Sequence, residues 1–341
     1  MVSGVQRLLP RVGVVRARCF QDVADLLHVA PRPERVCDQE EEQPLPAWLS
    51  LLARQSAVGQ PLVGGRNNQG VWLHQLHPES PDCPIWLIEK RSPRRREARL
   101  HRDLRRWQLA HPEANLLPRV YGVLPYGNSW RLFQAYVPEP VVAPMDAVEA
   151  GQLLASLAFA FHRTMAAVHG SSDRPAVELL ARQQQRLSTW LREDEPLAPS
   201  RIERLVMRLQ SRLADEPLVL AHNDLHWDNI RMIQLSGVSQ HQVIDLGRVG
   251  WNLPGAEFHG ALRLSLLGGR RQPIWRHAVD HYAALSGGDP EALMLACLWF
   301  GLVHGAGIWS QAAASSLSRQ RRRESRVLGR ILNRLEAQLE R

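Results

Sequence analysis

The sequence has few cysteines, and their spacing excludes several classes of site. The four cysteines among its 341 residues are Cys19, Cys37, Cys83 and Cys297, and no two of them form a CxxC pair. This spacing indicates neither a zinc site nor a redox motif. Four scattered thiols in a chain of this length are typical of a reducing compartment, so we expect a cytoplasmic protein.

Long hydrophobic runs are also absent. The longest apolar stretch, around Ala292 to Ile308, is interrupted by His304 and by glycines, and no run reaches the ~18 residues of a membrane span. We therefore expect no membrane partner. The first 20 residues carry four arginines and no acid, which is compatible either with a transit peptide or with a basic helix or strand pair.

The composition is that of a soluble globular protein, with 45% hydrophobic and 22% charged residues, and it excludes disorder, collagen and coiled coil. The 42 basic residues exceed the 34 acidic ones, which gives a net charge of +8. The arginine runs at 94–96 and 319–323 have few aromatic neighbours and belong to no recognisable nucleic-acid module. We expect solvated helix faces there and no nucleic-acid partner, although a basic rim would attract anions.

Lysine is almost missing. Of the 42 basic residues, 41 are arginine and one is lysine, Lys90. Arginine cannot replace lysine where a compact ammonium group must fit a tight site. The single lysine therefore either marks such a site or is there by chance, and its position in the fold decides between the two.

The pattern of residues predicts an α+β chain in three parts. Residues 1–55 form an extension that ends near an acidic, proline-containing run. Residues 56–137 show five short strand patterns and one helix pattern over 93–110, which predicts a small antiparallel sheet. Residues 138–341 are mainly helical, with two short apolar strands that end near residues 221 and 244. A cleft between a small sheet lobe and a larger helical lobe is a common place for a ligand site.

The strongest motif is AHNDLHWDNI at 221–230, followed by VIDLG at 243–247. A buried strand leads to Asp224, Asn229 follows five residues later, and Asp245 comes sixteen residues after that. Phosphoryl transfer requires a carboxylate that orients the attacking hydroxyl, and an amide and a second carboxylate that hold magnesium against the phosphates. These residue types at this spacing point to that chemistry.

The two motifs resemble those of the aminoglycoside phosphotransferase and choline kinase group, whose usual wording is HGDLHPGN and IDFG. The resemblance covers about residues 60–310 and implies a two-lobed protein-kinase-like fold that uses ATP and Mg²⁺. It implies that Asp224 is the catalytic base, that Asn229 and Asp245 hold magnesium, and that His222 braces the loop. The sequence departs from the wording at Asn223, at residues 227–228 and at Leu246, and none of these changes removes a functional atom.

The resemblance also assigns the nucleotide side. Lys90 ends the third strand, where it would bind the α- and β-phosphates and be held by Glu97 in the following helix. Glu89 points to the other face of its strand. Glu97 could instead pair only with neighbouring arginines.

Two further nucleotide contacts are expected. Gly65, in the glycine-containing turn between the first two strands, would approach the phosphates, unless this turn is a plain hairpin. Gln134 and Tyr136, between the lobes, would offer backbone groups to adenine by analogy with the group.

Other features have local explanations. The triplet His101-Arg102-Asp103 spells a protein-kinase motif but precedes the lobe boundary, so we expect a solvated helix face. Glu257 either caps a helix or contacts substrate. His162 and His169 lie in one helix pattern, where a hydrogen-bonded core histidine is the commoner outcome.

These patterns predict a phosphotransferase with an alcohol group as acceptor. The acceptor would be a small molecule such as an amino sugar, an amino alcohol, a sugar or a related metabolite. A protein Ser/Thr kinase would need a long activation segment, whereas Glu257 follows Gly247 by only ten residues. A non-catalytic nucleotide-binding regulator is the other alternative, although Lys90, Asp224, Asn229 and Asp245 are all present.

Overall fold

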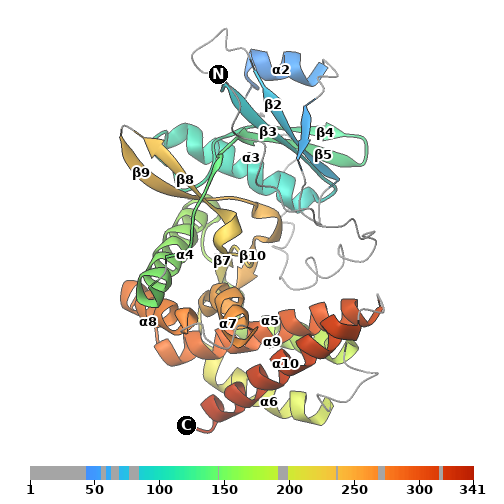
Figure 1. Ribbon diagram of the computed structural model, residues 1–341, viewed down its shortest axis with the longest axis vertical. Helices are drawn as coiled ribbons and strands as arrows, with labels where there is room; N and C mark the ends of the chain where they lie inside the picture. Colours follow the sequence, from blue (N-terminus) through green and yellow to red (C-terminus); the bar gives the residue numbers. More distant parts are fainter. Residues whose placement is uncertain are drawn as a thin grey trace.

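The computed structural model describes residues 44–54, 59–62, 69–76, 84–144, 146–190, 199–235, 237–267, 273–314 and 318–341. A small antiparallel sheet lies at one end of the molecule and a larger group of helices at the other, as Figure 1 shows. The predicted α+β architecture with two lobes is therefore confirmed.

The small lobe is built on one five-stranded sheet. Its strands are β1 (Gln60–Leu62), β2 (Gly70–Gln75), β3 (Trp86–Ser92), β5 (Ser129–Ala135) and β4 (Val120–Tyr126), in that spatial order. All neighbours are antiparallel, and Lys90 on the central strand lies opposite Val71 of β2 and Leu132 of β5. Lys90 therefore sits in the most constrained part of the sheet.

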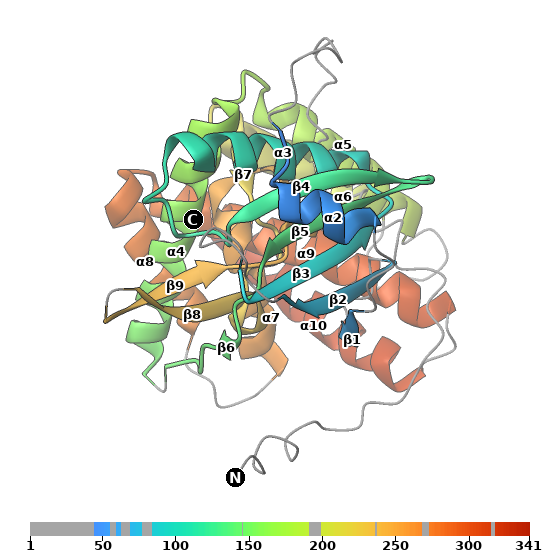
Figure 2. The same ribbon diagram turned by 90° about the horizontal axis from the view of Figure 1, so that it is seen from above.

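Two helices cover opposite faces of this sheet. The helix α3 (Arg95–Ala110) packs Ala98 against Leu132 on one face. The helix α2 (Ala47–Arg54) packs Leu49 against Phe133 on the other, because adjacent strand residues point in opposite directions. Residues 47–54, which we expected in an extension, thus contribute to the core of the sheet; Figure 2 shows α2 lying across the strands.

The segment after β5 leads into the second lobe. It forms β6 (Glu139–Pro140), which pairs with β8 (Ile230–Leu235), and β8 pairs with β9 (Val238–Val243). A separate pair joins β7 (Val219–Ala221) to β10 (Gly250–Asn252). These strands hold both motif loops, because one loop connects β7 to β8 and the other connects β9 to β10.

Seven α-helices of the described residues form most of the rest of this lobe. They are α4 (Ala147–His169), α5 (Ala176–Trp190), α6 (Pro199–Leu213), α7 (His259–Leu267), α8 (Ile274–Ser286), α9 (Pro290–Ala314) and α10 (Ser318–Leu339). The stretch Pro290–Ala312 of α9 is long and apolar enough to cross a membrane, but 83% of its most apolar window is buried. A helix that is apolar on all sides and enclosed by its neighbours is a core helix.

Candidate active site

Lys90 lies between two carboxylates from different parts of the chain. Its Nζ is 2.7 Å from Oε1 of Glu97 in α3 and 2.7 Å from Oδ1 of Asp245 in the loop after β9. Burial alone would lower the pKa of Lys90, but the charges of Asp245 and Glu97 outweigh it and raise the pKa. The only lysine of the sequence is therefore a charged group at the junction of the two lobes.

Glu97 is held in position by its own neighbours. Ser92 donates from Oγ to Glu97 Oε2 at 2.6 Å, so both carboxylate oxygens have a partner. Burial opposes ionisation, but the charge of Lys90 keeps the pKa of Glu97 below its ordinary value. The alternative in which Glu97 pairs only with arginines is thereby excluded, because its contact with Lys90 is direct.

The loop that carries Asp245 packs tightly against this ion pair. Asp245 adopts a left-handed backbone conformation with φ of 62° and ψ of 71°. A Cβ at Gly247 would lie 3.2 Å from both Asp245 Oδ1 and Lys90 Nζ, so this close approach favours glycine. Arg94 Nη1 donates to Gly247 O at 2.6 Å and ties the loop to the small lobe. The charge of Lys90 holds the pKa of Asp245 well below its usual range.

The catalytic-motif loop begins at a residue with unusual backbone geometry. Asn223 has a φ of 62°, which asparagine and glycine tolerate better than other residues. This explains why asparagine can stand where the usual wording of the resembled group has glycine. Asn223 Oδ1 accepts from Asn252 Nδ2 at 2.7 Å, and its own amide nitrogen reaches Gly250 O at 3.1 Å. The conformation is thus fixed by the neighbouring strand β10.

The carboxylate of Glu257 fixes the backbone of this loop. The backbone N–H of His222 donates to Oε1 of Glu257, and that of Asn223 donates to Oε2 at 3.0 Å. Glu257 is 1% exposed and lies inside the short 3₁₀ helix Pro254–Phe258, so it does not cap the start of a helix, and a contact with substrate stays a prediction. Burial would raise the pKa of Glu257, but its hydrogen bond to His162 and the charges nearby lower it. Glu257 therefore positions the residues that precede Asp224.

His222 of the catalytic motif and His162 of α4 are both buried, whereas His169, at the end of α4, is exposed and is not a core residue. His222 Nε2 donates to Ile244 O at 2.9 Å and so links the loop after β7 to the residue before Asp245. His162 lies 2.8 Å from Tyr282 Oη and 3.2 Å from Glu257 Oε1, which makes it a hydrogen-bonded core residue. His222 thus connects the two motif loops.

Asp224 is partly exposed, and its main partner is Arg248. Arg248 Nη1 donates to Asp224 Oδ1 at 3.2 Å, and the same nitrogen lies 3.3 Å from Nε2 of His304 in α9. His226 Nε2 is 3.9 Å from Asp224 Oδ1. Sequence reasoning missed Arg248, although it directly follows IDLG and is the first cation after the metal motif.

Asn229 and Asp245 are brought together by strand pairing. The carbonyl of Asn229 accepts from the N–H of Ile244, next to Asp245, at 2.9 Å. The side-chain Nδ2 of Asn229 donates to Asp224 O, so this contact does not use Oδ1 of Asn229. The contacts of Asp245 with Lys90 and Gly247 both use Oδ1 and not Oδ2. Two hard oxygens fit Mg²⁺, which takes few protein ligands when phosphates complete its shell.

The described residues contain no cluster of three or more His, Cys, Asp or Glu side chains suited to a metal ion.

The structure gives only partial information on the other residues predicted to contact the nucleotide and on the triplet at 101–103. Gly65 lies outside the described residues. Gln134 is paired within β5, and Tyr136 N is 3.5 Å from Trp86 O, so a contact of either with adenine stays a prediction. The triplet at 101–103 is in α3, but His101 is 1% exposed, so a solvated face was wrong for that residue. The His101 ring can be buried because its Nδ1 donates a hydrogen bond to the backbone carbonyl of Glu97.

Comparison with known proteins identifies the family. Residues 58–295 match the phosphotransferase enzyme family, and the chain belongs to that family. No curated protein matches the sequence.

Solved structures share the fold at low sequence identity. An aminoglycoside phosphotransferase from Alicyclobacillus acidocaldarius is 15% identical, with a TM-score of 0.50 over 89% of this chain and 99% of that one. A macrolide 2'-phosphotransferase from Brachybacterium faecium is 18% identical, with a TM-score of 0.51 over 83% and 97%. An ethanolamine kinase from Plasmodium vivax is 10% identical, with a TM-score of 0.51 over 83% and 85%. The kinase-like fold is shared, and the resemblance stated from the motifs is confirmed.

Proposed function

We propose that this protein is an ATP- and Mg²⁺-dependent kinase that phosphorylates a hydroxyl group of a small molecule. The observation that carries the proposal is the position of Lys90, whose Nζ lies 2.7 Å from both Glu97 and Asp245. In kinase-like enzymes a lysine–glutamate pair and a metal-binding aspartate must be in place together. Family membership and the acceptors named for the similar structures support a small molecule.

Each residue of the site has a role in this proposal. The acceptor hydroxyl oxygen forms a bond to the γ-phosphorus as the bond to the β–γ bridging oxygen breaks, and ADP leaves. Asp224 orients the hydroxyl and accepts its proton, and Arg248 fixes the carboxylate through Oδ1. Lys90 binds the α- and β-phosphates. Asn229 and Asp245 would hold magnesium, which would neutralise phosphate charge when bound.

The proposal assigns a different role to each lobe. Residues 56–137 would bind the nucleotide, with Gly65, Gln134 and Tyr136 as further contacts, and residues 138–341 would supply the catalytic loop and the acceptor site. The few scattered cysteines are in keeping with a cytoplasmic enzyme.

The test is ATP turnover with magnesium across a panel of hydroxyl-bearing metabolites, with GTP as a second donor. Asp224→Ala serves as the blank. We expect at least one metabolite to stimulate turnover by the wild type alone. Tight ATP binding without stimulation by any compound would instead favour a protein acceptor or a non-catalytic regulator.

A further inference from the structure

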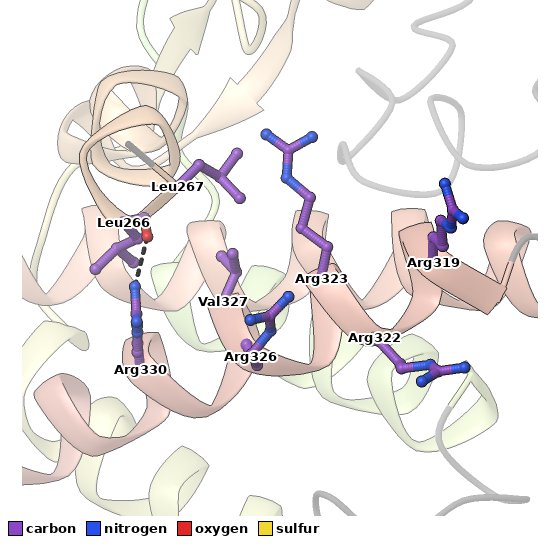
Figure 3. A pocket seen from close by; sticks show the side chains of 8 residues that line it. All are labelled: Leu266, Leu267, Arg319, Arg322, Arg323, Arg326, Val327 and Arg330. Atoms are coloured by element: carbon purple, nitrogen blue, oxygen red, sulfur yellow. Dashed lines mark hydrogen bonds between the residues drawn. The ribbon is translucent and has the colours of Figure 1, made fainter. Parts of the chain in front are cut away.

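The arginine run of α10 lines a pocket and is not only a solvated face. The pocket residues from this helix include five arginines, which we call the arginine groove: Arg319, Arg322, Arg323, Arg326 and Arg330. Offsets of three, four, seven and eleven residues place them on one side of a helix. The pocket has a volume of about 540 Å³, within the range of small-molecule sites. Figure 3 shows these side chains along α10, beside the end of α7.

Among the described residues, no neighbouring acid balances the positive charge of the groove. Across the ranges that the structure describes, Arg319, Arg322, Arg323 and Arg326 form no ion pair, and no carboxylate lines the pocket. Like charges at helical spacings of three and four repel one another. A cluster of guanidinium groups around a pocket is favourable when an anion shares it, because planar guanidinium binds phosphate and carboxylate through two parallel hydrogen bonds.

The groove is connected to the catalytic loop by one short helix. At the start of α7, His259 packs on His304 with 4.6 Å between ring centroids, and His304 in turn contacts Arg248, the partner of Asp224. At the other end of α7, Leu266 lines the pocket and accepts from Arg330 Nη1 at 2.7 Å. The seven residue steps from His259 to Leu266 rise about 10 Å along the helix at 1.5 Å each. An extended small molecule can cover that distance.

Three carboxylates of the described residues near these two points already have partners. Glu257 accepts from two backbone amides, and Glu324 of α10 pairs with Arg263 at 2.5 Å. Asp224 itself accepts from Arg248. A polycationic acceptor would need uncommitted carboxylates on this route, whereas an anionic acceptor needs the guanidinium groups that are present.

We propose that the arginine groove binds the anionic group of the phosphoryl acceptor. The acceptor is then a hydroxyl compound that also carries phosphate or carboxylate groups. This inference rests on the proposed kinase function and narrows its substrate class. The anionic group stays bound and unchanged while the hydroxyl at the other end reacts beside Asp224.

The experiment compares matched acceptors and matched variants. Glucose and glycerol are tested against glucose 6-phosphate and glycerol 3-phosphate, with ethanolamine and kanamycin as cations, at low salt. The groove variant is Arg323→Gln with Arg326→Gln, because glutamine keeps helix propensity. The control is Arg99→Gln with Arg341→Gln, which removes the same charge at exposed positions outside the groove. We expect turnover with a phosphorylated acceptor, and a KM for it that rises roughly tenfold to a hundredfold in the groove variant alone.

A binding measurement tests the arginine groove independently of which acceptor compounds are chosen. Inorganic phosphate is titrated calorimetrically into the wild type and both double variants, and we expect binding to be lost only in the groove variant. Turnover with neutral or cationic acceptors alone, dependent on Asp224, would preserve the kinase and overturn the anionic acceptor. Equal phosphate binding by the wild type and the groove variant, or RNA binding that survives excess phosphate, would also overturn it. Phosphate binding at the groove without any turnover would count against the kinase and not against the anion site.

Discussion

Lys90 Nζ lies 2.7 Å from Asp245 Oδ1, although the two residues are 155 positions apart. The contact joins the central strand of the small sheet to the loop that follows β9 in the helical lobe. It places the predicted phosphate-binding cation directly beside a predicted metal ligand. Because Lys90 also contacts Glu97, its ammonium group links three elements of the site: strand β3, helix α3 and the loop after β9.

Replacement of Lys90 by arginine should abolish most activity, even though arginine fills every other basic position. The larger planar guanidinium cannot reproduce contacts of 2.7 Å to Glu97 and Asp245 at the same place. We expect kcat/KM for ATP to fall by about 100-fold or more, as for loss of a preorganised charged group. Arg99→Lys, on the exposed side of α3, is the control and should retain full activity. Unchanged turnover by Lys90→Arg would contradict the assigned role.

Asp224→Asn should separate catalysis from nucleotide binding. The amide keeps the size of the side chain but cannot accept the acceptor's proton, so kcat should fall by roughly 10²–10⁴-fold. The Kd for ATP, measured by fluorescence or calorimetry, should change little, because Asp224 acts on the acceptor. Asp228→Asn is the matched control, since that carboxylate is 95% exposed and lies four residues further along. Equal losses in both variants would refute a specific role for Asp224.

Glu257→Gln should lower both stability and kcat without changing nucleotide affinity. One amide oxygen cannot accept from the N–H groups of both His222 and Asn223, so one buried donor loses its partner. The expected loss in the free energy of unfolding is about 1–3 kcal/mol. A kcat that falls while the KM for ATP stays constant would identify a positioning role, and a kcat equal to that of the wild type would exclude it.

Glu89 should give the protein an acid-sensitive stability. Burial would raise its pKa, but hydrogen bonds from His74 and Arg131, the charge of Arg131 and a hydrogen bond from Arg91 lower the pKa to about 2. Because the folded-state pKa is below the ordinary value of 4.5, the contribution is complete above pH 4.5 and is lost as the pH falls towards 2. A shift of this size corresponds to about 3 kcal/mol.

Urea unfolding of the wild type and Glu89→Gln between pH 2.5 and 7, values chosen to bracket roughly both pKa values, measures this contribution. The difference in free energy of unfolding between the two proteins should shrink as the solution becomes more acidic. A difference that is independent of pH would show that Glu89 acts through packing alone. Glu178→Gln, at an exposed pair with Arg182, is a control for loss of a surface carboxylate.

Much of the fold was predictable because its signals are local. Alternating and helical patterns over 70–76, 83–90 and 93–110 correspond to β2, β3 and α3, and the patterns after residue 147 correspond to the long helices. The role of α2 was not predictable, because an eight-residue apolar pattern does not say which surface it covers. Burial against Phe133, more than 70 residues away, depends on the assembled sheet.

The sequence by itself determined which functional side chains are present: one lysine, an Asp–Asn–Asp series at fixed spacing, and an Arg-rich helix. It also placed these groups at strand ends, because periodicity and turn residues act over a few positions. Only the tertiary structure decided which partners meet. Arg248 reaches Asp224, and Glu257 reaches the loop after β7, because packing of β7, β10 and α9 sets distances between segments that local patterns leave free. The same packing of α7 on α10 turned a run of arginines into one side of a pocket.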